Sequence, residues 1–270
     1  MKTLLVTGAS GRIASALRPI LLQSYKLHLV DQKDVGPLEQ GETLFVGSIA
    51  DRTLVAKAAS GCDAIIHLAC VHGTHLGFEE SLDSNYRGTL QLLEASVQAG
   101  ARFVFASSHH IFGQLEKDSP VDETALAPDG FYALSKAFGE AACALYARKY
   151  GMPTLVVRVG NADPQALDAR RQRLWISPHD LAKLVVLGVE HSDITYDIVY
   201  GVSDVKQPFF DNSRAFSLGY APKDNADSNL APTFTDYASM SEADGVGFIG
   251  GAYAPVLPHS TKDDHEDPIG

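Results

Sequence analysis

Short apolar runs alternate with amphipathic segments along the chain, and this alternation constrains the fold more than any other feature. The runs are nearly continuous in apolar residues, as expected of strands that are buried on both faces. Strand–helix repeats of this kind predict a parallel sheet with helices on both faces and right-handed connections. The predicted strands are residues 2–7, 26–31, 43–46, 64–68, 103–107, 154–159 and 194–200, and the predicted helices are residues 11–23, 52–59, 78–99, 131–150 and 177–190.

A glycine-containing loop follows the first predicted strand. Gly8 and Gly11 lie in the segment TGASGRI of residues 7–13, where glycines let the backbone turn sharply and approach a pyrophosphate. The helix that follows presents free N–H groups and the positive end of its dipole to that anion. Asp31 ends the second strand, at the place where a carboxylate binds ribose hydroxyls and repels a 2′-phosphate. This combination predicts NAD rather than NADP as the cofactor.

Tyr132 and Lys136 are four residues apart in a predicted helix, which puts both side chains on one face. A phenol with a pKa of about 10 is a poor base at neutral pH. A nearby ammonium and the positive charge of an oxidised nicotinamide would lower that pKa, and the phenolate could then accept a proton. Ser108 follows the fifth strand, at the sheet edge where ligands bind in open α/β folds. These three are the candidate catalytic residues.

The expected fold is therefore α/β, a Rossmann-type doubly wound parallel sheet with a small C-terminal substrate cap. Residues 1–160 would form the NAD-binding domain, to which a segment of about 177–202 returns. Residues 161–176 and 203–257 would form a small substrate-binding region, because Gly, Pro, Asn and Asp become frequent there. Residues 258–270 would be a flexible acidic tail.

Charge and composition exclude several classes of partner. The net charge of −11 leaves no basic footprint for nucleic acid or an anionic membrane. No apolar run approaches the roughly 18 residues of a membrane span, and the N-terminus lacks the apolar core of a signal peptide. Cys62, Cys70 and Cys143 have no metal-ligand spacing. We therefore expect reduced thiols, no metal site and a cytoplasmic protein.

Taken together, these motifs resemble those of the extended short-chain dehydrogenase/reductase superfamily. The resemblance covers nearly the whole chain, and it is closest to the uronate dehydrogenases. It is carried by residues 61–68, 103–110, 128–140 and 210–225, of which the last segment lies outside the general superfamily motifs. Uronate dehydrogenases oxidise the anomeric carbon of glucuronate or galacturonate with NAD and release an aldarolactone. The resemblance implies the same reaction here.

The resemblance also implies roles for individual residues. Tyr132 would be the catalytic base, Lys136 would orient the ribose and lower the pKa of the phenol, and Ser108 would position the substrate. The cofactor-binding residues would be Gly8, Ser10, Gly11, Arg12, Ile13, Asp31, Ser48, Ile49, Leu68, Ala69, Cys70, Asn85, Tyr132 and Lys136.

The substrate-reading residues of that family are partly replaced in this chain. The family's Ser-Asn-His strip reads Ser-His-His at residues 108–110, and its serine after the sixth strand is Asn161. The family's substrate arginine corresponds to Arg170 or Arg171. Because Arg suits a carboxylate or a sulfonate, we expect a small anionic sugar as substrate. The candidate substrate-binding residues are His72, Ser108, His109, His110, Tyr132, Asn161, Arg170 and Arg171, with His75 and Arg173 expected nearby.

Three alternatives remain open at this point. The same oxidation could act on a sulfosugar, a neutral aldose or another sugar acid. Nucleotide-sugar epimerases and dehydratases share the Ser, Tyr and Lys set, but they need a larger C-terminal domain. A protein that only senses a dinucleotide would keep the fold without needing a tuned phenol. By resemblance alone, we also expect a homo-oligomer that forms through helices 78–99 and 131–150.

Overall fold

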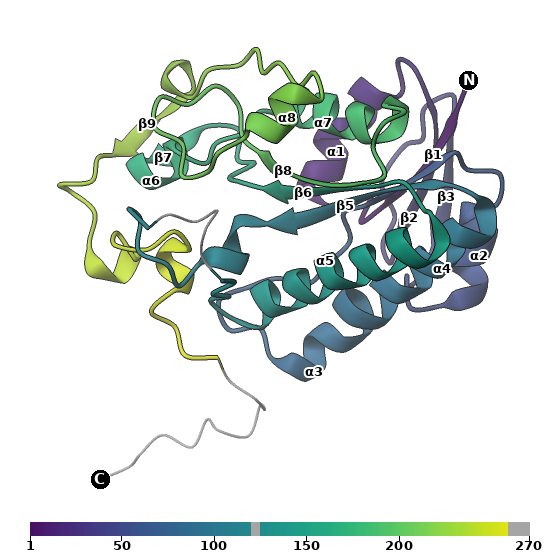
Figure 1. The fold of residues 1–270 in the computed structure, drawn as a ribbon, viewed down its shortest axis with the longest axis horizontal. Helices are drawn as coiled ribbons and strands as arrows, with labels where there is room; N and C mark the ends of the chain where they lie inside the picture. The colour runs from purple at the N-terminus through teal and green to yellow at the C-terminus, as the bar shows by residue number, and fades with distance from the viewer. Residues whose placement is uncertain (120–124, 259–270) are drawn as a thin grey trace, which may run out of the picture.

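A computed structural model describes residues 1–119 and 125–258 (Figure 1). Seven parallel strands form one sheet in the order β3-β2-β1-β4-β5-β6-β8. The order reverses between β1 and β4, which creates the crevice where open α/β sheets bind ligands. This sheet confirms the predicted Rossmann-type fold. Its strands are β1 (Thr3–Thr7), β2 (Lys26–Asp31), β3 (Glu42–Val46), β4 (Ala64–His67), β5 (Arg102–Ser108), β6 (Thr154–Val159) and β8 (Tyr196–Gly201).

Helices cover both faces of the sheet and bury two separate cores (Figure 1). Successive residues of β1 point to opposite faces, so Leu4 packs in one core and Leu5 in the other. Each fully buried side chain of this kind contributes roughly 1.5–3 kcal/mol. One face carries α1 (Arg12–Leu21), α7 (Pro178–Glu190) and α8 (Ser213–Ser217), and the other carries α2 (Arg52–Ala59), α4 (Gly88–Ala99) and α5 (Phe131–Tyr150).

The helix predicted over residues 78–99 is not continuous. It consists of α3 (Phe78–Ser81), a π-helical segment over Leu82–Arg87 and then α4. The wider turns of a π-helix reposition side chains relative to an α-helix. In this segment the side chain of Asn85 is buried.

A small second sheet lies beside the carboxyl ends of β5 and β6 (Figure 1). It pairs β7 (Ala166–Asp168) with β9 (Leu230–Thr235), and α6 (Ala169–Gln172) follows β7. Of the segments predicted to form a substrate cap, β7, α6 and β9 thus lie at the ligand-binding edge of the main sheet, whereas α8 packs against one of its faces. Of the predicted tail, residues 259–270 lie outside the described residues. None of the helices in the described ranges combines the length and the apolar character that a membrane span requires.

Candidate active site

The loop after β1 turns sharply at Gly8 and passes close to the end of β4. Gly8 has a φ of +68°, in the left-handed region that favours glycine. A β-carbon on Gly8 would lie 2.8 Å from the Cα of Ala69, so no side chain fits there. Gly11 precedes α1 without a side-chain hydrogen bond to the helix. The first N–H groups of α1 can therefore receive a pyrophosphate.

A buried histidine fixes the end of β4 behind this loop. His67 Nδ1 lies 3.0 Å from Thr7 Oγ1, and its Nε2 lies 3.0 Å from Thr89 Oγ1. Thr7 Oγ1 also accepts hydrogen bonds from the N–H groups of Leu68 and Ala69. Burial lowers the pKa of His67 to about 3, so the imidazole is neutral. The segment that faces Gly8 is held in place by these bonds.

The carboxylate of Asp31 lies at the end of β2, beside the glycine loop. Its Oδ2 accepts a hydrogen bond of 2.9 Å from the Ser10 N–H, and its Oδ1 accepts one of 3.0 Å from the Lys33 N–H. Each oxygen keeps a lone pair that can accept from a ribose hydroxyl. The N–H groups at the start of α1 and the carboxylate of Asp31 together fit the pyrophosphate and the ribose of an adenosine dinucleotide. A cavity of about 540 Å³ opens here, and its lining includes the predicted residues Gly8, Ser10, Gly11, Arg12, Ile13, Asp31, Ile49, Leu68, Ala69 and Cys70.

Four predicted cofactor residues do not line this cavity: Tyr132 and Lys136, which line a second cavity, and Ser48 and Asn85. Ser48 Oγ accepts a hydrogen bond of 3.1 Å from the Ala50 N–H, within its own turn. The Asn85 amide binds the backbone N–H and carbonyl of Val71 and donates to Ser135 Oγ at 2.9 Å. Asn85 thus holds Val71, which does line the cavity, against α5. Its side chain therefore positions the cavity wall without contacting the cavity.

Tyr132 and Lys136 lie on one face of α5, as predicted, but the ammonium does not bind the phenol. Lys136 Nζ lies 5.7 Å from the centroid of the Tyr132 ring and donates to the Ala106 carbonyl at 2.7 Å. Burial and the nearby Cys70 raise the pKa of Tyr132, whereas a hydrogen bond with Ser108 opposes this shift. In the protein without cofactor, the pKa of Tyr132 is therefore raised and not lowered, so Lys136 alone does not produce the predicted decrease.

A second cavity of about 290 Å³ surrounds Tyr132 and Lys136. All the predicted substrate residues line it: His72, Ser108, His109, His110, Tyr132, Asn161, Arg170 and Arg171. This cavity shares part of its wall with the cofactor cavity, namely Arg12, Ile13, Leu68, Cys70 and His72. A small molecule here would therefore lie next to the end of a bound dinucleotide.

Several buried polar atoms of this cavity wall lack a partner within the protein. They are His109 Nε2, Asn161 Oδ1 and Arg170 Nε, and Asp129 Oδ1, behind the wall residue His110, is a further such atom. Buried polar atoms are rarely left unpaired in native proteins because an unmade hydrogen bond costs about 1–3 kcal/mol. Burial also lowers the pKa of His109 well below its usual value, so its Nε2 can accept. The wall is therefore suited to a polar ligand.

The three neighbouring arginines have different surroundings. Arg170 is buried, its Nη1 donates to the Ile249 carbonyl at 2.7 Å, and it forms no ion pair with any described residue. Arg171 pairs with Asp168 at 2.8 Å. Arg173 lies outside the cavity, where its guanidinium stacks 3.7 Å from the Phe209 ring. His75 does not line the cavity either.

Three residues at the site were not predicted from the sequence. Tyr253 lines the cavity and packs against His110, with ring centroids 4.4 Å apart. Asp129 contacts His110 from behind, and Asp163 forms an ion pair with Arg12 across the cavity. Asp129 lies within residues 128–140, which resemble the uronate dehydrogenases, so that segment held a usable signal.

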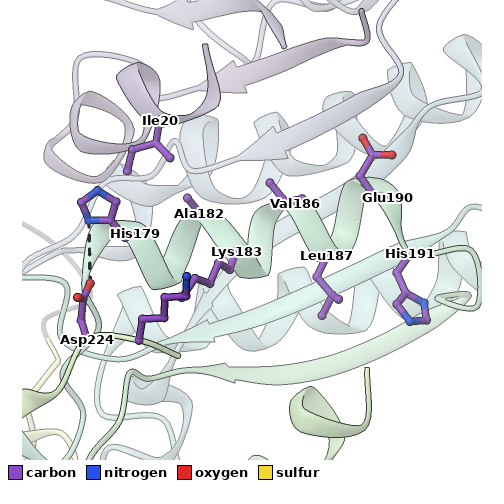
Figure 2. Close-up of a pocket in the computed structure, with 10 residues that line it drawn as sticks. Ile20, His179, Ala182, Lys183, Val186, Leu187, Glu190, His191 and Asp224 are labelled. Carbon is purple, nitrogen blue, oxygen red and sulfur yellow. Dashed lines mark ion pairs between the residues drawn. The ribbon is translucent and has the colours of Figure 1, made fainter. Parts of the chain in front are cut away.

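A further hollow of about 760 Å³ lies elsewhere, on the outer face of α7 (Figure 2). His179 and Lys183 at this hollow pair with the acids Asp224 and Asp180, at 4.0 Å and 2.7 Å. Glu190 at the same hollow pairs with Lys2, and no unpaired buried polar atom of the described residues lies in its lining. Its apolar lining is Ile20, Ala182, Val186 and Leu187 (Figure 2). Over residues 1–119 and 125–258, no three metal-ligating side chains converge.

Comparisons with known proteins agree with this geometry. Residues 4–162 match the model of the NAD dependent epimerase/dehydratase family. The uronate dehydrogenase of Pseudomonas putida is 34% identical, over 94% of this chain and 96% of that protein. An NAD-dependent glucose-6-phosphate dehydrogenase of Haloferax volcanii is 31% identical, over 82% of this chain and 93% of that protein.

Among solved structures, a mutant uronate dehydrogenase from Agrobacterium tumefaciens complexed with NAD has a TM-score of 0.88. It is 30% identical, and the alignment covers 97% of this chain and 100% of that chain. The predicted resemblance and the predicted cofactor are thereby confirmed. The chain belongs to the NAD-dependent epimerase/dehydratase family and is an NAD-dependent sugar oxidoreductase similar to the uronate dehydrogenases.

Proposed function

We propose that this enzyme oxidises the anomeric carbon of a hexuronate, glucuronate or galacturonate, and releases an aldarolactone. The observation that carries the proposal is one small cavity that joins Tyr132 and Ser108 to the buried Arg170, beside the cofactor cavity. Its volume of about 290 Å³ is at the lower end for ligand pockets. That size suits one sugar ring and disfavours the nucleotide diphosphate of an epimerase substrate.

Residues of the glycine loop and of β2 would hold the cofactor. The N–H groups at the start of α1 would bind the pyrophosphate, and Asp31 would bind the adenosine ribose. Lys136, whose ammonium is buried at the same wall, would donate to the nicotinamide ribose. Bound NAD supplies the hydride acceptor and a positive charge.

Tyr132 would take the proton of the anomeric hydroxyl. The hydroxyl oxygen loses this proton, and the anomeric carbon loses a hydride to the cofactor. The product has a carbonyl next to the ring oxygen, which is a lactone. Ser108, which bonds the phenol, would donate to the reacting oxygen. Because burial raises the pKa of Tyr132 in the protein alone, the phenolate depends on positive charge brought to the site.

Arg170 would bind the substrate carboxylate. It is buried, it forms no ion pair with a described residue and its Nε has no hydrogen-bond partner. A planar guanidinium of this kind suits a bidentate carboxylate. Arg171 would have a secondary role, since Asp168 already occupies it.

A second candidate is the same oxidation of a sugar with a different anionic group. The glucose-6-phosphate dehydrogenase of Haloferax volcanii among the relatives favours it, as do the histidines that replace hydroxyl or amide side chains in the cavity. A sulfosugar or another sugar acid fits the same reasoning. A neutral aldose would leave Arg170 buried without a counter-charge.

The test is the rate of NADH formation by the purified protein with a panel of sugars. The panel contains glucuronate, galacturonate, glucose 6-phosphate, a sulfosugar and the neutral aldoses glucose and galactose. We expect the highest kcat/KM with a uronate, and a higher KM for it in Arg170→Lys than in Arg171→Lys. Preferred turnover of another anionic sugar would replace the uronate by that sugar, and the absence of any turnover would overturn the proposed reaction.

A further inference from the structure

The carboxylate of Asp129 lies in a space that two glycines leave free for it. Asp129 precedes α5, its side chain is fully buried, and its Oδ2 lies 2.6 Å from His110 Nδ1. A β-carbon on Gly113 or on Gly250 would collide with this same oxygen. Two chain segments that are far apart in sequence therefore accommodate one acid behind His110.

The ring of His110 is held on several sides and has one nitrogen left for a ligand. Its centroid lies 4.4 Å from that of Tyr253 and 4.2 Å from that of His109. The Tyr132 ring lies edge-on at 5.8 Å. His110 lines the substrate cavity, and Asp129 occupies Nδ1, so Nε2 is the atom available to a sugar close to the catalytic phenol.

The state of Asp129 decides what His110 Nε2 can do. Burial, with Arg170 and His72 adding to it, lowers the pKa of His110 to about 3, so the ring is neutral near pH 7. A neutral imidazole carries one N–H. An ionised Asp129 can only accept, which places the hydrogen on Nδ1 and leaves Nε2 as an acceptor. A protonated Asp129 donates to Nδ1 and leaves Nε2 as a donor.

We propose that Asp129 is a positioning residue that holds His110 in the tautomer whose Nε2 accepts a hydrogen bond from a sugar hydroxyl beside the reacting carbon. This inference rests on the proposed function for the identity of the ligand. Burial raises the pKa of Asp129 to about 7, so the acid changes state near neutral pH. The ionisable groups that face the pair are His72, His109, Tyr132, Arg170 and Tyr253.

The first test compares the pH profile of kcat/KM in the wild type and in Asp129→Asn. We expect the wild type to gain activity through an ionisation near pH 7, as Nε2 becomes an acceptor. The variant keeps the size of the side chain but cannot ionise, so it loses this step and on the order of tenfold in kcat/KM at pH 8. An unchanged profile in the variant would overturn the inference.

A double-mutant cycle separates positioning from a general effect on the fold. If Asp129 acts through His110, Asp129→Asn lowers kcat/KM about tenfold when His110 is present. In a protein that already carries His110→Gln, the same change should lower kcat/KM by under about twofold. Equal losses in both backgrounds would contradict the inference. NADH binding should be unchanged in all variants, because neither residue lines the cofactor cavity. Asp180→Asn, which changes a buried acid away from the site, should leave the pH profile unchanged.

The tautomer can also be measured without any substrate. In ¹⁵N spectra of imidazole nitrogens, assigned with the His110→Gln variant, we expect His110 Nδ1 to carry the hydrogen above pH 7. In Asp129→Ala the hydrogen should move largely to Nε2. The same tautomer in both proteins would refute the inference even if the sugar panel shows turnover. Conversely, if no sugar of the panel is turned over, the proposed function is wrong. The ¹⁵N measurement still tests whether Asp129 sets the tautomer of His110.

Discussion

Asp31 Oδ2 accepts a hydrogen bond of 2.9 Å from the Ser10 N–H, so the acid that ends β2 is tied directly to the glycine loop. The carboxylate therefore stands at a fixed place beside the cofactor cavity. A fixed negative charge at this place favours ribose hydroxyls and repels a 2′-phosphate.

Replacing Asp31 by Asn should weaken the preference for NAD. The amide keeps the size of the side chain and its acceptor for Ser10, but it removes the charge that repels NADP. We expect the ratio of kcat/KM for NAD to that for NADP to fall by at least roughly tenfold, which corresponds to ~1.4 kcal/mol. Steady-state kinetics with both cofactors checks this, and an unchanged ratio would show that Asp31 does not set the preference.

Tyr132→Phe should abolish sugar oxidation and leave cofactor binding nearly intact. The phenyl ring keeps the packing on α5 but offers no oxygen to accept the proton. We expect kcat to fall by at least about a hundredfold, within the usual range for a general base. Fluorescence titration with NADH, run on the same preparation, should give the wild-type affinity. A parallel loss of binding and activity would assign Tyr132 a structural role instead.

The local parts of the site were predictable from the sequence because short spacings determine them. The glycine loop and Asp31 belong to one strand–helix–strand unit, and Tyr132 and Lys136 belong to one helix. All the residues proposed to bind substrate also line one cavity. Parallel strands bring their carboxyl ends to the same edge, so residues that follow different strands meet there.

Contacts between distant segments were not predictable from one sequence. Arg170 differs from Arg171 because its guanidinium donates to Ile249, 79 residues further along. Tyr253 reaches His110 from the C-terminal segment. The position of the Lys136 ammonium depends on the Ala106 carbonyl of β5. Such pairings follow from packing, which leaves no periodic pattern in the chain.

A buried ion pair behind Ser108, the proposed catalytic serine, should be essential for stability. Glu140 accepts two hydrogen bonds from Arg158 and one of 2.5 Å from Ser107, the neighbour of Ser108. Glu140→Gln leaves the Arg158 charge buried and unpaired, which costs about 3–5 kcal/mol. Denaturant unfolding measures this loss. The double variant Glu140→Leu with Arg158→Met should be more stable than Glu140→Gln, and the reverse order would contradict this account.

The exposed face of α5 should mediate self-association. Leu134, Leu145 and Tyr150 are 43%, 53% and 62% exposed, although all are large and apolar. Leu134 and Leu145 are about three helical turns apart and thus share a face. We expect light scattering to give the mass of a homo-oligomer, and Leu145→Glu to shift it toward the monomer. Phe216→Glu, on α8 at the opposite face of the sheet, should not change the mass.

Acid should destabilise the fold through its buried histidines. Burial lowers the pKa of His67 and of His110 to about 3, and it lowers that of His109 well below its usual value. An unfolded histidine takes up a proton below about pH 6.5. Between that pH and about 3, the unfolded state binds more protons than the native state, so the free energy of unfolding falls with falling pH.

His67 allows this acid effect to be tested at a single residue, because it is fully buried and lies outside both cavities. Each such histidine contributes up to ~1.4 kcal/mol per pH unit to the slope. We measure the free energy of unfolding with denaturant from pH 6.5 to 4.5 and compare its slope against pH in the wild type and in His67→Gln. The slope gives the number of protons taken up on unfolding. We expect this number to be lower by about one in the variant. His179→Gln, which changes an exposed histidine, should keep the wild-type slope. An equal slope in His67→Gln would mean that other groups cause the acid sensitivity.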